Sequence, residues 1–234
     1  MHAQDDAFSI LDRALAAANA DEADAMFVSS DQNISRYANS QIHQNMSEES
    51  AFLTLRVIAG GAMGVATTTV FDDDEIARTA ALARETARHS QPVYGFAGLY
   101  RGGEEVPHLD SFDGATAAMS PLEKALALRA TFDRGAANGV QFAGSFSTGA
   151  AAVACGNTHG VRRFAQMTHA DATMIAIGAS GSGYATARAR RAAVIDVAAL
   201  GDEAIRKATL ASGRAEDLAP GSFDVILEPP AIAE

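Results

Sequence analysis

Aliphatic side chains alternate with other side chains between Ser50 and Ile58, and this pattern restricts the secondary structure that this part of the chain can adopt. The stretch contains the run Phe52-Leu53-Thr54-Leu55-Arg56-Val57, in which every second residue is aliphatic. Successive side chains of a β-strand point to opposite faces of a sheet. A strand with one aliphatic face and one mixed face is typical of an antiparallel sheet that buries a single face.

Elements that would pack with this strand are predicted on both sides of it. Period-two patterns predict strands over Ala25–Ser30, Asn33–Asn39 and Met63–Thr69, with a tight turn at Gly60-Gly61. An apolar stripe predicts a helix over residues 5–20, and the acidic run Asp72–Glu75 predicts the capped start of another. Helices and strands together make an α+β domain, which we place at residues 1–100.

A second domain is predicted in the other half of the chain. Residues 90–119 are rich in Gly, Pro and polar side chains, and we place a connector at 101–119. Ser120-Pro121-Leu122-Glu123 then has the composition of a capping box at a helix start. Four strands and a helix are predicted at Val140–Ser147, Ala150–Cys155, Val161–Thr168, Ala172–Ile177 and Asp202–Ala211. The second domain is placed at 120–221.

The predicted fold is therefore α+β, with two domains that each contain an antiparallel sheet flanked by helices. A last strand is predicted at Phe223–Leu227, and Ala231–Glu234 looks like the start of another element. We expect residues 222–234 to begin a further, C-terminal domain that lies beyond this sequence.

Charge and composition exclude several classes of protein. The 234 residues include 29 acidic and 18 basic side chains, and the net charge of −11 argues against nucleic-acid binding. No apolar run approaches the roughly 20 residues that cross a bilayer, and Asp5 and Asp6 stand where a signal peptide would be basic. The single cysteine, Cys155, cannot form an internal disulfide. We expect a soluble cytoplasmic protein, with neither nucleic acid nor a membrane as partner.

Two patterns in the second half suggest ligand binding, and each has a simpler explanation. His169 and Asp171 share one face of a strand and could supply two metal ligands, but exposed strand polarity is favoured without a third ligand. Gly178, Gly181 and Gly183 invite a phosphate-loop interpretation, but their order does not match the known fingerprints. A flexible exit from a strand is favoured for these glycines.

Two further candidates are also better explained by structure than by chemistry. Cys155 could be a nucleophile, but it ends an apolar strand and is favoured as an inert, buried thiol. Asp72–Glu75 could bind a cation, but four acids at a helix start are more often dipole-stabilising surface charge. None of the six histidines has His-Glu-x-x-His spacing. We assign no catalytic, cofactor-binding or metal-binding residue.

The sequence resembles the TldD/PmbA (TldE) family along nearly its whole length. The matching stretches include Arg36–Gln44, Leu55-Arg56-Val57 with Gly60-Gly61 and Gly64, Gly95-Phe96 with Gly98-Leu99, Gly156-Asn157 with Gly160, Gly181 with Gly183 and Ala185, and Pro220–Pro229. They occur in the family's order. The chain is similar to the N-terminal portion of such a protein.

The resemblance implies a cytosolic zinc metallopeptidase system, also described as a modulator of DNA gyrase, that degrades small or unfolded peptides. In that family the TldD-type subunit carries a His-Glu-x-x-x-His zinc helix and a later cysteine ligand, and the PmbA-type partner lacks them. Both would correspond to sequence beyond Glu234, so zinc is expected only in a TldD-type C-terminal domain. The residues Asp224–Pro229 are more similar to the PmbA type.

The resemblance further implies a homodimer or heterodimer with a TldD/PmbA-type subunit, and a peptide as substrate. This chain would shape dimerisation and substrate access and would have no peptidase activity alone. The alternative is a free-standing module that binds peptides or a partner without any protease.

Overall fold

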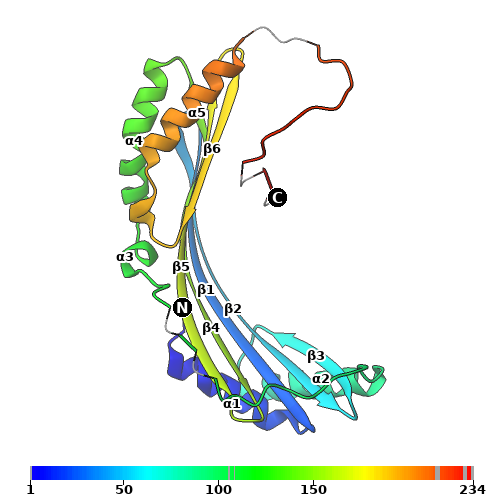
Figure 1. Cartoon of the computed structure of the whole chain (residues 1–234). Coiled ribbons are helices and arrows are strands. Elements are labelled where there is room, and N and C mark those ends of the chain that lie inside the picture. The colour runs from blue at the N-terminus through cyan, green and yellow to red at the C-terminus, as the bar shows by residue number, and fades with distance from the viewer. Residues whose placement is uncertain (1, 105, 108, 214–216, 229–230, 233–234) are drawn as a thin grey trace. The chain divides into compact units, whose positions relative to one another are not determined.

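The computed structural model describes residues 2–104, 106–107, 109–213, 217–228 and 231–232. Its elements are α1 (Gln4–Ala18), β1 (Glu22–Ala38), β2 (Gln41–Ala59), β3 (Ala62–Thr68), α2 (Asp73–His89), α3 (Gly114–Ala117), α4 (Pro121–Ala137), β4 (Gln141–Asn157), β5 (Arg162–Ile177), β6 (Ser182–Ala189), a 3-10 turn (Ala192–Val194) and α5 (Val197–Ala211) (Figure 1). The predicted α+β class is confirmed. No helix among the described residues is long and apolar enough to cross a membrane.

The strands form one six-stranded sheet in the order β3-β2-β1-β4-β5-β6. The outer pairs, β2 with β3 and β5 with β6, are antiparallel. The sequence predicted two separate sheets, and it predicted breaks between strands near Asp31-Gln32 and near Gly149. Both places lie inside long continuous strands, β1 and β4. Neighbouring strands satisfy the backbone there, so polar residues and a glycine do not break the extended chain.

Contacts divide the chain into two compact units. Unit 1 comprises Met1–Gln32, Ser47–Ala117 and Gly149–Thr168, and unit 2 comprises Asn33–Met46, Ala118–Thr148 and His169–Glu234. The domains expected from the sequence were contiguous, at 1–100 and 120–221, whereas these units alternate along the chain. The reason is that β1, β2, β4 and β5 each contribute residues to both units.

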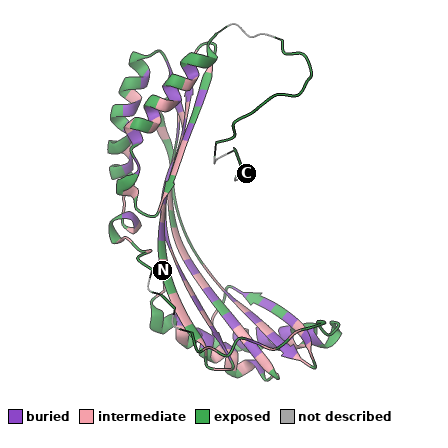
Figure 2. Ribbon diagram, in the orientation of Figure 1, coloured by how far each residue is buried: buried purple, intermediate pink, exposed green. Residues whose placement is uncertain are grey.

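The core of unit 1 lies between the sheet and helices α1 and α2. Leu53, Leu55 and Val57 are fully buried, which confirms the face predicted from their alternation. Figure 2 shows buried positions alternating with more exposed ones along the strands. Much of the facing surface is alanine, including Ala14 of α1 and Ala80 of α2. Small side chains let helices approach a sheet closely, so this core is thin and closely packed.

The core of unit 2 lies between the sheet and helices α4 and α5, and includes Phe142 and Met174. Helix α4 turns Leu128 and Lys124 toward this core. Leu122 and Leu126, which follow each other at helical spacing, are 67% and 60% exposed. The packed face of α4 is therefore not its most apolar face.

Helix starts and turns follow the predicted local chemistry. The Asp72 carboxylate caps α2 by accepting from the Glu75 backbone N–H at 2.8 Å. Ser120 and Glu123 form both bonds of a capping box at the start of α4. Asn39 and Ser40 adopt positive φ values of 52° and 55° in the tight turn between β1 and β2.

One prediction near the end of the chain is wrong, and one strand was missed. Residues 223–227 form no strand in the structure, and Ile226 is 97% exposed. A strand needs a neighbour to accept its backbone hydrogen bonds, and the described residues offer none there. In contrast, β6 was not predicted, because glycines and arginines interrupt its pattern. Pro229, Pro230, Ala233 and Glu234 lie outside the described residues.

Candidate functional site

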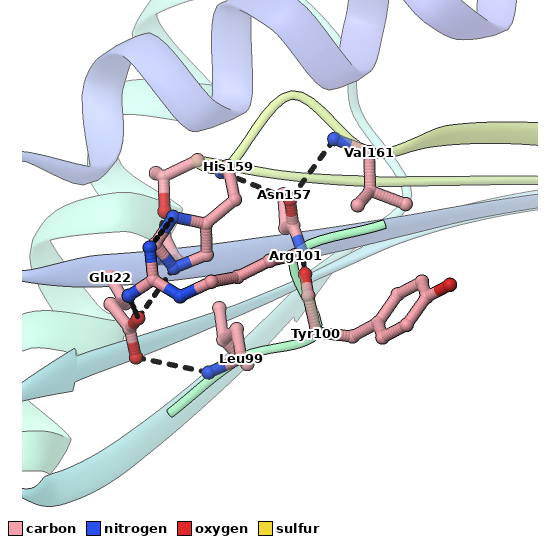
Figure 3. Close-up of polar contacts among 9 residues, drawn as sticks. Glu22, Leu99, Tyr100, Arg101, Asn157, His159 and Val161 are labelled. Atoms are coloured by element: carbon pink, nitrogen blue, oxygen red, sulfur yellow. Dashed lines mark hydrogen bonds and ion pairs between the residues drawn. The ribbon is translucent and has the colours of Figure 1, made fainter. Parts of the chain in front are cut away.

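A half-buried carboxylate at the start of β1, that of Glu22, fastens the long segment after α2 onto unit 1 (Figure 3). Glu22 accepts a hydrogen bond from His159 Nε2 at 2.5 Å and one from the Leu99 backbone N–H at 3.1 Å. The Arg101 guanidinium lies 3.8 Å from the same carboxylate. The hydrogen bond from His159 is the main cause that lowers the pKa of Glu22. Three distant parts of the sequence therefore meet at one charge.

Asn157 makes a second attachment beside the first. Its side-chain amide donates to the Tyr100 carbonyl at 2.6 Å, and its side-chain oxygen accepts from the backbone N–H groups of His159 and Val161 at 3.0 and 3.2 Å (Figure 3). These bonds shape the turn between β4 and β5 and hold Tyr100 against the sheet. The position of Tyr100 matters because it borders a groove.

The groove lies in unit 1 and has a volume of about 490 Å³. It is lined by Asp24, Ala25, Met26, Thr54, Arg56, Val65, Tyr100, Cys155, Gly156, Asn157 and Val161. Thr54 and Arg56 alternate with the buried Leu53, Leu55 and Val57, so this is the face of the sheet that helices α1 and α2 leave uncovered.

The electrostatics of the groove centre on one ion pair. Arg56 donates two hydrogen bonds to the Asp24 carboxylate, one of them from Nε at 2.9 Å. The hydrogen bond with Asp24 raises the pKa of the Arg56 guanidinium. Burial raises the pKa of the nearby Cys155 thiol, so the thiol stays protonated near neutral pH. A protonated thiol and a paired guanidinium suit binding better than nucleophilic chemistry.

The remaining sequence candidates do not join this groove. Asp171 forms an ion pair with Arg188 across β5 and β6, which supports the favoured interpretation of surface strand polarity. Gly181 and Gly183 pack under α5, where a Cβ on Gly183 would lie 2.1 Å from the Ala204 carbonyl oxygen. Close packing, rather than a flexible strand exit, explains these two glycines. Among the described residues no three His, Cys, Asp or Glu side chains lie close enough to hold a metal ion.

The sequence indicated Asn157 only as part of a stretch that resembles the TldD/PmbA family, and it did not single out Glu22, Arg101 or His159. His159 is 137 residues from Glu22 in the chain, and no spacing rule connects them. The matches around Gly98-Leu99 and Gly156-Asn157 were the only signal, because both stretches contribute to the attachment of the segment after α2.

Replacing Glu22 by glutamine should loosen this attachment. We expect faster hydrogen exchange at the Leu99 amide, because a neutral acceptor binds His159 and Leu99 more weakly. The lowered pKa gives a second expectation. The stabilisation by Glu22 is complete above its ordinary pKa of 4.5 and is lost as the pH falls through the lower folded value. The difference in unfolding free energy between wild type and variant should therefore shrink in acid.

Glu85→Gln is the matched control for this prediction. Glu85 pairs with His89 on the surface of α2. Its replacement by glutamine makes the same chemical change away from Leu99. Equal exchange rates at Leu99 in wild type and Glu22→Gln would contradict the role given to Glu22.

The fold and the groove define a class of protein: an α+β domain whose sheet presents one uncovered face with a groove. Residues 23–87 match the family model described as PmbA/TldA metallopeptidase domain 1. This match confirms the resemblance to the TldD/PmbA family over residues 23–87. No curated protein sequence matches the chain.

Solved structures share the fold across most of the chain. A proposed modulator of a DNA gyrase from Thermotoga maritima is 20% identical with a TM-score of 0.73, over 86% of this chain and 47% of that one. TldE from Thermococcus kodakarensis is 15% identical with a TM-score of 0.71, over 86% and 47%. A proposed modulator of DNA gyrase from Bacteroides thetaiotaomicron is 16% identical with a TM-score of 0.75, over 89% and 50%. The chain spans about half the length of these proteins.

Proposed function

We propose that this chain is the N-terminal part of a TldD/PmbA-type zinc metallopeptidase system, in which it shapes dimerisation and the access of peptide substrates. The observation that carries the proposal is the match of residues 23–87 to a metallopeptidase first domain. The fold shared with TldE over 86% of the chain supports it.

The catalytic residues of this system are proposed to lie in the part of the relatives that this chain does not cover. The chain covers 47% of TldE. Zinc would be held by a TldD-type C-terminal domain, and residues 222–234 would lead into such a domain. The similarity of Asp224–Pro229 to the PmbA type favours a subunit without the zinc helix.

The proposed partners are a second TldD/PmbA-type subunit and a peptide. The groove with Asp24 and Arg56 on its floor supports a peptide-handling role, since an apolar groove with a few polar groups suits an extended chain. The cytoplasm is the proposed location, because the only cysteine, Cys155, is a free thiol.

The proposal is tested by expressing the longest product of the gene and measuring its zinc content and its cleavage of unfolded peptides, with this chain alone as control. We expect no zinc-dependent cleavage by the chain alone, and a longer product that supports cleavage only with a zinc-bearing partner. Zinc-dependent cleavage by the chain alone would contradict the proposal. Stoichiometric zinc with a His-Glu-x-x-x-His helix would make the longer product the TldD-type subunit.

The alternative is a binding module with no protease. It predicts that the gene product is no longer than this sequence. It also predicts no peptide cleavage when the product is combined with any partner subunit. The same expression experiment therefore separates the two functions.

A further inference from the structure

Residues Gly98–Gly103, which we call the strap, lie beside the turn between β4 and β5 and beside the groove of unit 1. Gly98 has a φ value of +97°, and Gly102 and Gly103 have values of +81° and +108°. Glycine adopts such values readily and other residues rarely do, so glycines allow the chain path at both ends of the strap. Leu99 is 8% exposed and anchors the strap, whereas the two residues after it are exposed.

The imidazole of His159 contacts the strap and β1 through its two ring nitrogens (Figure 3). Its Nε2 lies 2.5 Å from Glu22 Oε1, and its Nδ1 lies 3.5 Å from Nη1 of Arg101. A guanidinium can only donate hydrogen bonds, so Nδ1 must accept from Arg101. The ring proton is then on Nε2, where it is donated to the carboxylate. Both contacts are therefore made by a neutral imidazole.

A proton added to His159 would be bound to Nδ1 and would point at Arg101. The guanidinium has no acceptor for that proton, and two positive charges would face each other at the present 3.5 Å. The attraction between the imidazole and Glu22 would become stronger, because both groups would then be charged. Protonation therefore displaces Arg101 and leaves the imidazole in place.

Protonation of His159 is the change of charge expected at this place between pH 5 and 8. Histidine is the side chain that ordinarily titrates in that range. The charged side chains that contact His159 in the described part of unit 1 are Glu22 and Arg101. The hydrogen bond from His159 lowers the pKa of Glu22, and a guanidinium keeps its charge at any of these pH values. Neither partner changes its charge in this range.

The strap also contributes to the wall of the groove. Tyr100 lines the groove, and a Cβ on Gly102 would lie 3.5 Å from Val161, which is another lining residue. Gly102 directly follows Arg101, so displacement of Arg101 draws Gly102 away from Val161. The groove, whose lining also includes Cys155, then becomes more accessible.

We propose that Arg101 and His159 form a pH-sensitive latch on the strap, which is closed while His159 is neutral and open once it is protonated. In the closed state Arg101 contacts the imidazole. In the open state Arg101 and Gly102 leave the turn between β4 and β5, and access to the groove widens. The latch goes beyond the proposed function and does not depend on it.

The first part of the strap stays attached in both states. The Leu99 backbone N–H donates to Glu22, and the Tyr100 carbonyl accepts from the Asn157 amide. None of these groups changes its charge between pH 5 and 8. The latch therefore moves the residues from Arg101 onward and does not release the whole strap.

The only cysteine of the chain makes the latch measurable. Cys155 lines the groove, and its rate of reaction with 4,4'-dithiodipyridine, which modifies thiols in acid as well as at neutral pH, measures access to the groove. The rate in wild type is divided by the rate in Arg101→Met, in which the latch is absent. Both rates are measured at one pH, so the ionisation of the thiol cancels. We expect wild type to react about threefold more slowly than Arg101→Met at pH 8, and nearly as fast at pH 5.5.

Two further variants assign the effect to the imidazole. In His159→Gln the amide can donate to Glu22 and accept from Arg101 without ever changing its charge. Its rate relative to Arg101→Met should therefore be the same at both pH values. Arg88→Met removes an exposed arginine that pairs with Glu85 on α2, and this variant should react like wild type throughout.

Nitrogen-15 relaxation supplies a second measurement on the wild-type chain. The order parameters of the Arg101 and Gly102 amides should be lower at pH 5.5 than at pH 8, whereas that of Leu99 should stay unchanged. A wild-type rate ratio that does not change with pH, an equal change in His159→Gln, or unchanged order parameters at Arg101 would each overturn the latch. The zinc and cleavage measurements on the longer product decide the proposed function separately.

Discussion

Replacing Gly183 by alanine is expected to lower the free energy of unfolding by about 1–3 kcal/mol. A Cβ there would lie 2.1 Å from the Ala204 carbonyl oxygen and 2.5 Å from the Ala208 nitrogen, both in the backbone of α5. Because backbone atoms cannot rotate away, α5 must move off the sheet. Gly64→Ala should have an effect of the same size in unit 1, where a Cβ would lie 2.0 Å from the Ala83 carbonyl oxygen of α2.

Urea unfolding of both variants measures this prediction, with Gly213→Ala and Gly114→Ala as controls. At either control position no atom of the described residues lies within 4 Å of an added Cβ. The control variants should stay within roughly 0.5 kcal/mol of wild type. Wild-type stability in Gly183→Ala or Gly64→Ala would mean that the helix and strand do not approach as closely as the structure indicates.

The second large effect concerns Lys124 of α4, whose side chain is fully buried. Its ammonium donates to the Asn33 carbonyl at 2.8 Å, and burial lowers its pKa to about 8 from 10.5. Between these values the unfolded chain binds more protons than the folded chain, so stability rises with pH. As the pH rises from below 8 to above 10.5, the free energy of unfolding of wild type should increase by up to about 3 kcal/mol relative to that of Lys124→Met.

Lys207→Met provides a control of opposite sign. Lys207 lies on α5, and its hydrogen bond to Glu228 at 3.0 Å raises its pKa. Its stabilisation is therefore present below pH 10.5 and lost above that value. Denaturation curves of the three proteins across this pH range separate the two lysines. Parallel pH dependence of wild type and Lys124→Met would show that Lys124 does not lose its charge more readily than an exposed lysine.

Local patterns in the sequence predicted most of the helices and strands. The alternation at Leu53, Leu55 and Val57 identified the buried face of β2, and the caps at Asp72 and Ser120 identified two helix starts. These predictions succeed because side-chain periodicity and capping depend on residues a few positions apart. β6 was missed since Gly183 is there for packing under α5, a reason that its own stretch of sequence does not reveal.

The candidate site was much less predictable. Glu22, Arg101 and His159 come from three separate stretches, and nothing in their spacing indicates that they meet. Likewise, Leu122 and Leu126 of α4 follow helical spacing but are exposed, whereas Lys124 of the same helix is buried. Both outcomes depend on which surfaces come together.

The sequence by itself determined the α+β class, the buried face of β2 and the resemblance to the TldD/PmbA family. Only the tertiary structure decided that the strands form one sheet and that Glu22 fastens the segment after α2. The physical reason is the range of the interactions. Periodicity and capping are local, whereas strand order and the meeting of charges arise from contacts between residues far apart in the chain.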